Sequence, residues 1–357
     1  MTKRVGIMTF PHSPSFGASL QMRALYDAIV RTGNEPYIIN YINDYMRDKK
    51  HISKQKKSLY QRTRNHLASY VSNIRFGCFE NELRFYPSNT ISTYDELIKL
   101  DSFFDCIVCG SDQVWNPKIT GKDMAYFLNF ASKAGRIAYA PSFGITELSN
   151  EEKIDIGREL KQFASLSVRE KQGVALVDSS VGTRPVVVVD PTMLMPYEYW
   201  VRLERKPRGL SKHYIADFTF HPNNETIGFT TTLKNETGFI CKKYSWSLRS
   251  IMDKSSISML GPREWLWYIH HADYVVTDSF HGAVFSILFQ REFYVSMTAQ
   301  TNSRLIDLLD EFNLSERKIT SRLQIGSIEY DSVGSILNRR VKESFTYLKD
   351  ALNRGII

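Results

Sequence analysis

The chain has 357 residues, of which 43% are hydrophobic and 24% are charged, and its formal net charge is +8. Both fractions are ordinary for a globular protein, the longest apolar runs fall far short of the roughly 18 residues that a membrane span needs, and four cysteines are too few for a disulfide scaffold. These values indicate a cytosolic protein, and the length indicates two domains because one hydrophobic core rarely grows beyond about 250–300 residues.

The chain begins Met1-Thr2-Lys3-Arg4 and runs straight into an apolar, strand-like stretch at 5–10, so no secretory signal is expected. Further strands are expected at 36–41, 106–109, 136–140 and 166–168, with helices at 18–32 and 151–163. Strands that alternate with helices favour a parallel sheet that is covered on both faces.

A second series of elements begins near residue 185, with a run of four valines at 186–189 that is too β-branched for a preferred helix. The next strands are expected at 214–218, 239–243, 274–277 and 293–297, and helices at 263–271, 282–289 and 303–312. We therefore expect an N-terminal domain over 1–180 and a C-terminal domain over 181–332. A last helix within 333–357 is expected to pack back on the first domain.

Two local features could suggest other chemistry. Cys106 and Cys109 form a C-x-x-C, but positions three apart in a strand face opposite ways, so no shared disulfide or metal is expected.

The segment from Arg47 to Arg64 has eight basic residues against one acid. It is a solvated helix or loop, or else a patch for an anionic membrane surface or a phosphorylated acceptor. No zinc finger, RNP-type motif or helix-turn-helix accompanies the charge, which argues against nucleic acid.

Ligands in open α/β sheets bind beyond the carboxyl ends of the strands. The residues that follow the expected strands are polar and contain glycine, and they lie at 11–21, 110–117, 141–144, 169–171 and 278–282. We expect the binding and catalytic residues on these loops.

The standard catalytic signatures G-x-G-x-x-G, P-loop, G-x-S-x-G and H-E-x-x-H are absent. His270 and His271 are adjacent rather than at helical ligand spacing, so no metal site is expected there. His281 differs, because it lies at a strand-to-helix turn between Ser279 and Gly282, ahead of an apolar helix that would hold it rigidly. Lone histidines are mostly structural, but this position favours an exposed imidazole with a catalytic function.

Arg169 also follows an expected strand, in Ser-Val-Arg-Glu-Lys. It could form a surface salt bridge with Glu170. Alternatively, its planar guanidinium could bind a carboxylate or phosphate through two parallel hydrogen bonds.

The order of several motifs resembles the polysaccharide pyruvyl transferase family over nearly the whole chain. They are Phe-Gly-Ala-x-Leu-Gln at 16–21, Gly-Ser-Asp-Gln-Val-Trp-Asn-Pro at 110–117, Ser-Val-Arg-Glu-Lys at 167–171, Val-Asp-Pro-Thr at 189–192, Ala-Asp-Tyr-Val-Val-Thr-Asp-Ser-Phe-His-Gly at 272–282 and Asn-Ser-Arg-Leu at 302–305. The resemblance implies an α/β fold of two Rossmann-like domains that face each other across a cleft, similar to glycosyltransferase B.

The resemblance also implies a reaction without a cofactor, in which phosphoenolpyruvate is the donor and two hydroxyls of one sugar are the acceptor. The products are a cyclic pyruvate ketal of a surface polysaccharide and phosphate. His281 takes the position of the family's general acid, and Arg169 that of an arginine that binds the donor's anionic groups, so the donor is expected in the cleft. The other candidate binding residues lie on the same motifs and loops: Phe16, Gly17, Gln21, Ser111, Asp112, Gln113, Ser142, Lys171, Ser279, Phe280, Asn302 and Arg304.

One motif departs from the family pattern. Several members carry Arg-Leu where this chain has Ser279 and Phe280. A second cation for the donor is therefore expected from Lys171 or Arg304.

The residue types suit this chemistry. Protonation of C3 of the donor gives an oxocarbenium ion at C2, a sugar hydroxyl attacks it, phosphate leaves, and a second hydroxyl closes the ring. Histidine, with a reference pKa of about 6.5, can supply the proton near neutral pH. At a helix N-terminus the imidazolium is disfavoured, and the anionic groups of a bound donor reverse this. Arginine and lysine can hold those anions without a metal.

Two other functions suit the same fold. One is a nucleotide-sugar-dependent glycosyltransferase, because helix N-termini can hold a diphosphate. The other is a non-catalytic carbohydrate-binding protein, because fold does not fix function. The expected partners are phosphoenolpyruvate, a sugar acceptor that is free, nucleotide-linked or lipid-linked, and the anionic inner face of the membrane, with a cytoplasmic, peripheral location.

Overall fold

The computed structural model describes residues 2–48, 59–207, 213–245, 256–297, 302–320 and 326–355, with the side chains of 59–69 and 302 left aside. The chain forms two compact units. The first comprises residues 1–56, 80–195 and 338–357, and the second comprises residues 57–79 and 196–337. Each unit contains a five-stranded parallel sheet.

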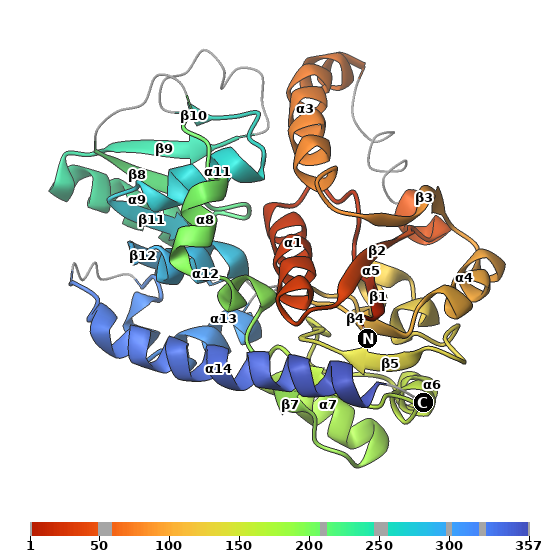
Figure 1. Ribbon diagram of the computed structural model, residues 1–357. Coiled ribbons are helices and arrows are strands. Elements are labelled where there is room, and N and C mark those ends of the chain that lie inside the picture. Colours follow the sequence, from red (N-terminus) through yellow and green to blue (C-terminus); the bar gives the residue numbers. More distant parts are fainter. Residues whose placement is uncertain are drawn as a thin grey trace. The chain divides into compact units, whose positions relative to one another are not determined.

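The sheet of the first unit has the strand order β3-β2-β1-β4-β5, and every neighbouring pair is parallel (Figure 1). Its strands are β1 (Arg4–Met8), β2 (Glu35–Tyr41), β3 (Phe85–Ile91), β4 (Cys106–Cys109) and β5 (Gly135–Ala138). The chain therefore leaves β1 toward one edge of the sheet, returns past it, and continues toward the other edge. A separate two-stranded sheet pairs β6 (Ser167–Val168) with β7 (Val186–Val187).

Polar caps start most helices of the first unit. Ser15 accepts a hydrogen bond from the N–H of Ala18 at the start of α1, and capping boxes begin α4 at Thr93 and α6 at Ser149. The helices are α1 (Phe16–Arg31), α4 (Tyr94–Leu100), α5 (Pro117–Thr120), α6 (Asn150–Leu160) and α7 (Lys171–Val181), with 3₁₀ turns at Asp101–Phe103, Met124–Phe127 and Pro191–Leu194.

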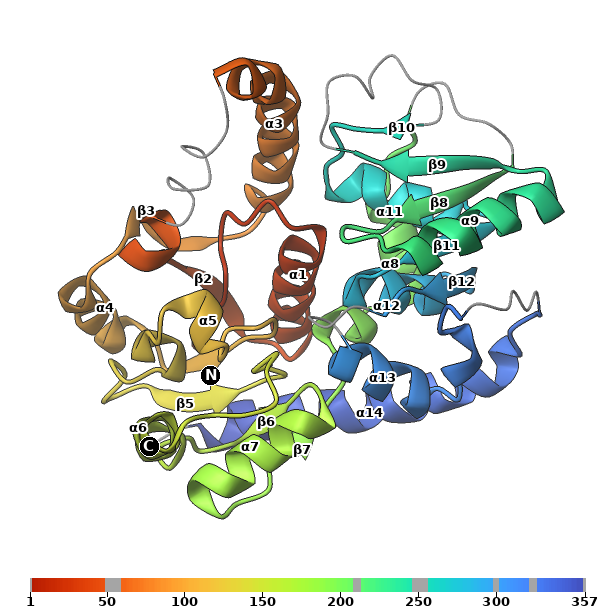
Figure 2. The same ribbon diagram turned by 180° about the vertical axis from the view of Figure 1, so that it is seen from behind.

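The sheet of the second unit repeats the pattern, with the order β10-β9-β8-β11-β12 and parallel pairing throughout. Figures 1 and 2 show α9 on one face of this sheet and α8 and α11 on the other, and α11 also contacts α12. The strands are β8 (Tyr214–Phe218), β9 (Ile240–Tyr244), β10 (Ser256–Ile257), β11 (Tyr274–Thr277) and β12 (Glu292–Val295). The helices are α3 (Leu59–Glu80), α8 (Tyr197–Leu203), α9 (Asn224–Thr237), α11 (Pro262–His270), α12 (Phe280–Leu288), α13 (Asn302–Glu311), a 3₁₀ turn at Ser315–Arg317 and the start of α14 (Tyr330–Arg354).

Aromatic side chains fill the cores of both units. In the second unit, the buried ring of Phe285 lies 4.9 Å from Trp200 and 5.4 Å from Trp265, nearly perpendicular to both. In the first unit, Trp115 stacks on Phe127 at 5.2 Å. Edge-to-face and offset contacts of this kind add to the free energy that burial of apolar surface provides.

The last helix, α14, begins in the second unit, but residues 338–354 belong to the first. There the Ser344 hydroxyl accepts a hydrogen bond from the N–H of Val189 at 3.0 Å, and the Tyr347 hydroxyl donates one to the carbonyl of Ala138 at 3.0 Å. These contacts attach the C-terminal part of α14 to β5 and to the loop after β7.

The valine run at 186–189 does not begin the second sheet. Its strand β7 pairs with β6, and the first unit continues to residue 195. A β-branched run looks the same in sequence whichever sheet it joins, so the expected start of the second domain at 181 differs from the observed division.

Several elements were not predicted from the sequence. Helix α9 carries five threonines and a glycine, which have low helix propensity, yet Asn223 caps it and Phe229 and Leu233 are buried on its inner face. Strand β3 contains Pro87 and lies at the edge of its sheet, where proline is tolerated. Helices α3 and α4 were also missed.

The strand expected at 106–109 is confirmed as β4, with both cysteines buried. Burial raises the pKa of Cys106 to about 12 and raises that of Cys109 further, which disfavours the reactive thiolate.

Among the described helices, none combines the length and the apolar character that crossing a bilayer would require. Most of the basic segment from Arg47 to Arg64 lies outside the described residues.

Candidate functional site

The strand order reverses direction at one place in each sheet, between β1 and β4 in the first and between β8 and β11 in the second. The loops at the carboxyl ends of these strand pairs diverge to opposite faces, which leaves a crevice where ligands bind in open α/β sheets. Many of the candidate residues lie on loops beside these two switch points.

In the second unit, the carboxylate of Asp278 joins the two loops at the switch point. It follows β11 directly and accepts hydrogen bonds from the backbone N–H of Phe220 at 2.9 and 3.0 Å and of His221 at 2.6 Å. Both donors lie on the loop after β8. The imidazole of His221 is exposed, with Nδ1 3.6 Å from the same carboxylate.

His281 lies on the first turn of α12, which Ser279 caps by accepting a hydrogen bond from the N–H of Gly282 at 3.4 Å. A side chain at position 282 would clash, since a Cβ there would lie 2.3 Å from Oγ1 of Thr277. Glycine therefore allows the first turn of α12 to approach the end of β11 closely. The Phe280 ring meets the imidazole edge to face, with the ring centroids 5.3 Å apart.

The expectation of an exposed imidazole is wrong, because His281 is only 7% exposed. Every residue of α12 is buried, so the helix carries its first turn into the packed interior. The sequence predicted the apolar helix correctly but not how deeply its N-terminus is buried. The rigid mount that the helix was expected to give is present.

Further polar groups surround the end of β8. Asp217 is buried and accepts hydrogen bonds from the N–H and the hydroxyl of Thr219 at 3.0 and 2.5 Å. Nζ of Lys243, on β9, lies 3.6 Å from the other oxygen of Asp217. A neighbouring pair, Thr226 and Ser296, shares a hydroxyl hydrogen bond of 2.5 Å beyond β12.

In the first unit, Arg169 belongs to a buried network of charges. Its Nη1 donates to Oδ2 of Asp190 at 3.0 Å, its Nε lies 3.5 Å from Oε2 of Glu170, and its side chain is 1% exposed. Burial would lower the pKa of Arg169, but the carboxylates of Glu170 and Asp190 raise it, so the guanidinium stays charged. The expected pairing of Arg169 with Glu170 is present, but the expectation that it lies at the surface is wrong, because both side chains are buried.

Two serines connect this network to neighbouring loops. The Ser111 hydroxyl donates to Oδ2 of Asp190 at 3.1 Å, and the Ser142 hydroxyl donates to Oε1 of Glu170 at 2.5 Å. The predicted residues Ser111, Ser142 and Arg169 thus come together through two acidic side chains, at the carboxyl ends of β4, β5 and β6.

The start of α1 lies against the same edge of the sheet, with Phe16, Gly17 and Gln21 buried. Nε2 of Gln21 donates to the hydroxyl of Thr9 at 2.9 Å, and that hydroxyl donates to the carbonyl of Ser111 at 3.3 Å. Oε1 of Gln21 is buried, and no hydrogen-bond partner for it occurs among the described residues.

The remaining predicted residues occupy different environments. Asp112 has a positive φ of 78° and shapes the turn, and Gln113 accepts a hydrogen bond from Nδ2 of Asn116 at 2.9 Å. Lys171 is exposed at the first position of α7, and Arg304 is buried on α13. The side chain of Asn302 lies outside the described part of the chain.

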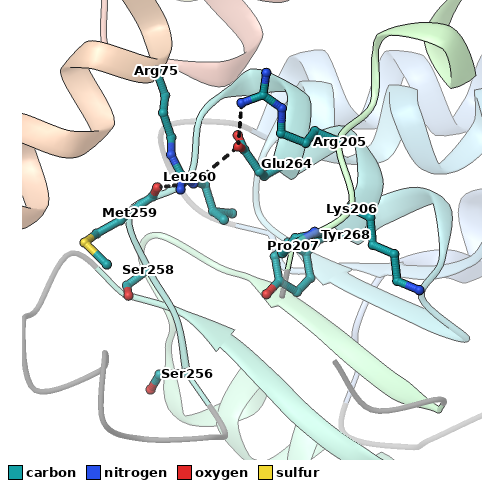
Figure 3. Close-up of a pocket in the computed structure, with 10 residues that line it drawn as sticks. All are labelled: Arg75, Arg205, Lys206, Pro207, Ser256, Ser258, Met259, Leu260, Glu264 and Tyr268. Atoms are coloured by element: carbon teal, nitrogen blue, oxygen red, sulfur yellow. Dashed lines mark hydrogen bonds and ion pairs between the residues drawn. The ribbon is translucent and has the colours of Figure 1, made fainter. Parts of the chain in front are cut away.

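A pocket of about 540 Å³ opens in the second unit, beyond the carboxyl end of β10 (Figure 3). Three basic side chains line it, Arg75, Arg205 and Lys206. Oε1 of Glu264 lies 3.4 Å from Nη1 of Arg75 and 3.8 Å from Nη1 of Arg205, and among the described residues Glu264 is the one acidic residue of the lining. Tyr268 and backbone of the segment after β10 complete the wall.

Several residues at these edges were not among the candidates from sequence, although the loop of Asp278 was. His221 and Asp278 follow strands that were correctly predicted, so their position was a usable signal. Glu80 carried no such signal, because its buried carboxylate reaches the loop after β1 from the end of α3. It accepts hydrogen bonds from the hydroxyl of Ser19 at 2.9 Å and from the N–H of His12 at 3.2 Å.

The family model for polysaccharide pyruvyl transferase matches residues 16–296, from the start of α1 to the residue after β12. The chain belongs to this family. Family membership makes it a transferase and accounts for the order of motifs from Phe16 to His281. None of the curated proteins matches the sequence.

Solved structures with a similar fold share little sequence with this family member. A protein from Listeria monocytogenes assigned as a UDP-N-acetylglucosamine 2-epimerase aligns with a TM-score of 0.51 and 9% identity over 99% of this chain and 92% of its own. The UDP-N-acetylglucosamine 2-epimerase from Neisseria meningitidis gives 0.48 and 11% over 98% and 94%, and MnaA of S. aureus gives 0.48 and 13% over 99% and 92%. The Listeria likeness confirms the fold class, two Rossmann-like domains similar to glycosyltransferase B.

Proposed function

We propose that this pyruvyl transferase family member moves the enolpyruvyl unit of phosphoenolpyruvate onto two hydroxyls of a sugar, with a cyclic pyruvate ketal and phosphate as products. Membership of the family supports a transferase that acts on a polysaccharide or its precursor. The observation that carries the proposal is the placement of His281 on the first turn of α12, beside Asp278 at a switch point.

In this proposal His281 is the general acid. It donates a proton to C3 of the donor, and the electron pair of the enol double bond forms the new C–H bond. The resulting cation at C2 is captured by a sugar hydroxyl, the C–O bond to phosphate breaks, and a second hydroxyl closes the ketal. Each hydroxyl releases one proton, of which one returns to His281 and the other leaves with the phosphate. An anchored histidine is well suited to the first transfer near neutral pH.

The N-terminus of α12 is proposed to hold the donor's phosphate. The first backbone N–H groups of a helix carry partial positive charge, which favours a bound anion by up to about 2 kcal/mol in a partly buried geometry. The close packing of Gly282 on Thr277 fixes this turn relative to the sheet. Phosphate bound there would lie beside the residue that supplies the proton.

The basic pocket beyond β10 is proposed to bind the acceptor's anionic carrier. Among the described residues, Arg75, Arg205 and Lys206 bring three positive charges against one negative charge from Glu264, which favours a phosphate or diphosphate. A sugar linked to a nucleotide or a lipid through diphosphate carries this group. We place the reaction in the synthesis of a surface polysaccharide, at the cytoplasmic face of the membrane.

A calorimetric titration tests the donor directly. The protein is titrated with phosphoenolpyruvate and, separately, with UDP-N-acetylglucosamine. We expect saturable binding of phosphoenolpyruvate that free phosphate weakens by competition. Binding of the nucleotide sugar alone would favour a glycosyltransferase, and binding of sugars without turnover would favour a carbohydrate-binding protein.

A further inference from the structure

Three side chains meet at the amino edge of the second sheet, far along the strands from the loops described above. Glu204 directly follows α8, His270 is the last residue of α11, and His271 caps that helix. Nδ1 of His270 lies 2.8 Å from Oε2 of Glu204, and Nε2 of His271 lies 3.9 Å from Oε1. One donor atom from each residue lies within 4.8 Å of the other two.

The outer nitrogen of each imidazole is held by a hydrogen bond. Nε2 of His270 contacts the hydroxyl of Tyr197 at 2.7 Å, and Nδ1 of His271 contacts the carbonyl of Trp267 at 3.1 Å. A carbonyl oxygen only accepts, so Nδ1 of His271 carries the hydrogen and its Nε2 presents a lone pair toward Glu204. Metal-binding histidines are commonly fixed in this way, with the ring nitrogen away from the ion bonded to a neighbouring group.

Aromatic contacts hold both imidazole rings in place. The ring of His270 stacks on Phe289 at 4.6 Å, and that of His271 stacks on Trp267 at 4.2 Å. Rings that are already packed lose little conformational freedom when they bind an ion.

We propose that Glu204, His270 and His271 bind a zinc ion, with a fourth position left to water. Two imidazoles and a carboxylate are a common ligand set for this ion. Bond lengths of about 2.1 Å in a tetrahedral site put the donor atoms roughly 3.3 Å apart. Nδ1 of His270 lies 2.8 Å from one oxygen of Glu204 and Nε2 of His271 lies 3.9 Å from the other, so small side-chain shifts would bring the three ligands to this spacing.

The proton balance is simple. When zinc takes Nδ1 of His270, the hydrogen on this ring moves to Nε2, which then donates to the Tyr197 oxygen. If His270 is an imidazolium paired with the Glu204 carboxylate before zinc binds, one proton is released to solvent when the ion binds. His271 needs no rearrangement. Its side chain is 39% exposed, which leaves a path for the ion to enter.

The site lies away from the residues proposed for pyruvyl transfer. His271 lies three residues before β11, whereas Asp278 and His281 follow the opposite end of that strand. Zinc would join the end of α8 to the end of α11, two helices that already contact each other. No metal site was expected from the sequence, because adjacent histidines do not lie on one helix face. The structure adds a third ligand, the carboxylate of Glu204 at the end of α8.

The test uses tag-free full-length protein that has been treated with a chelator, because a histidine tag would itself bind zinc. Calorimetric titration with ZnCl₂ should show one ion per chain, and the melting temperature should rise with zinc concentration. His271→Phe keeps the ring stacking without a ligand atom, and Glu204→Gln keeps the shape without the charge. Each should weaken zinc binding at least tenfold.

His213→Ala is the matched control, because His213 forms another histidine–carboxylate pair in the same unit, with Asp273 at 3.1 Å. This variant should bind zinc like the parent. If the parent takes up no zinc, or if both site variants bind it unchanged, the proposal is wrong. Should the variants fail to fold, anomalous diffraction at the zinc edge from parent crystals decides the question, because density away from these three residues would overturn it.

Discussion

Asp278, the residue after β11, accepts a hydrogen bond of 2.6 Å from the backbone N–H of His221, the third residue after β8. The same carboxylate accepts the N–H of Phe220, so a single buried side chain ties together the two loops of the switch point. Helix α12 starts two residues later. The position of His281 therefore depends on this carboxylate.

The Asp278→Asn variant should show whether Asp278 positions His281 or only stabilises the fold. An amide has only one oxygen, so its NH₂ group would face a backbone N–H, and an unsatisfied buried group costs about 1–3 kcal/mol. We expect a lower melting temperature and slower phosphate release. The control is Asp273→Asn at the other end of β11, where a carboxylate also accepts a backbone N–H, from Tyr214 at 2.9 Å. Equal loss of activity in both variants would mean that Asp278 acts through stability alone.

Arg169→Lys tests the buried charge network. A lysine keeps the charge but cannot contact Asp190 and Glu170 with the same planar geometry. We expect a lower melting temperature and at least tenfold weaker binding of phosphoenolpyruvate. Arg136→Lys is the control, since it alters another ion pair of the first unit, with Glu159 at 2.9 Å. Unchanged donor binding in Arg169→Lys would remove this arginine from the binding residues.

Asp101 makes the first unit sensitive to acid. Burial opposes its ionisation, but hydrogen bonds from the N–H groups of Ala134, Ser132 and Lys133 and from the Ser132 hydroxyl lower the pKa of this carboxylate. A lowered pKa in the folded state gives stability that is present above the unfolded pKa of about 3.9 and is lost as the pH falls through the folded value.

Asp101→Asn should therefore reduce the free energy of unfolding by about 2 kcal/mol at pH 7, the usual contribution of hydrogen bonds to a charged group. The difference from the parent should shrink between about pH 5 and pH 3, because protonation removes the same charge. Urea unfolding curves across this range provide the measurement. A difference that stays constant with pH would show that the charge of Asp101 does not contribute.

The basic segment from Arg47 to Arg64 leads to a prediction about membranes. Exposed charges are screened over about 8–10 Å at physiological ionic strength, so binding to acidic liposomes should be present at low salt and fall steeply as salt rises. Replacing Lys54, Lys56 and Lys57 with glutamine should weaken it. Sedimentation with phosphatidylserine vesicles measures this, and a complete lack of binding at low salt would contradict a membrane function.

The local pattern of the second half was readable from sequence. Strands at Tyr214–Phe218 and Tyr274–Thr277 have the expected bounds, and the polar residues that follow each strand lie at the predicted edge of the sheet. The apolar run after His281 predicted a core helix, and α12 is buried throughout, as expected of a helix that is hydrophobic on all sides.

Contacts between residues far apart in sequence could not be predicted. Nothing in the sequence shows that Asp190 pairs with Arg169, or that Glu204 meets two histidines some 66 positions later. The Ser72 hydroxyl of α3 donates to the carbonyl of Leu260, a contact that depends on tertiary packing rather than on local propensity. Single-sequence patterns locate elements and edges, but the pairs of side chains that act together emerge only from the fold.

The central claim is that His281 donates a proton to phosphoenolpyruvate during pyruvyl transfer. The most direct measurement is phosphate release from phosphoenolpyruvate with a library of sugar acceptors, for the parent and for His281→Gln, alongside melting curves. Glutamine keeps a hydrogen-bond donor in the buried position but cannot deliver a proton at neutral pH. We predict phosphate release by the parent, and a folded variant whose rate is lower by roughly 10²–10⁴-fold. A variant that turns over like the parent would contradict the claim.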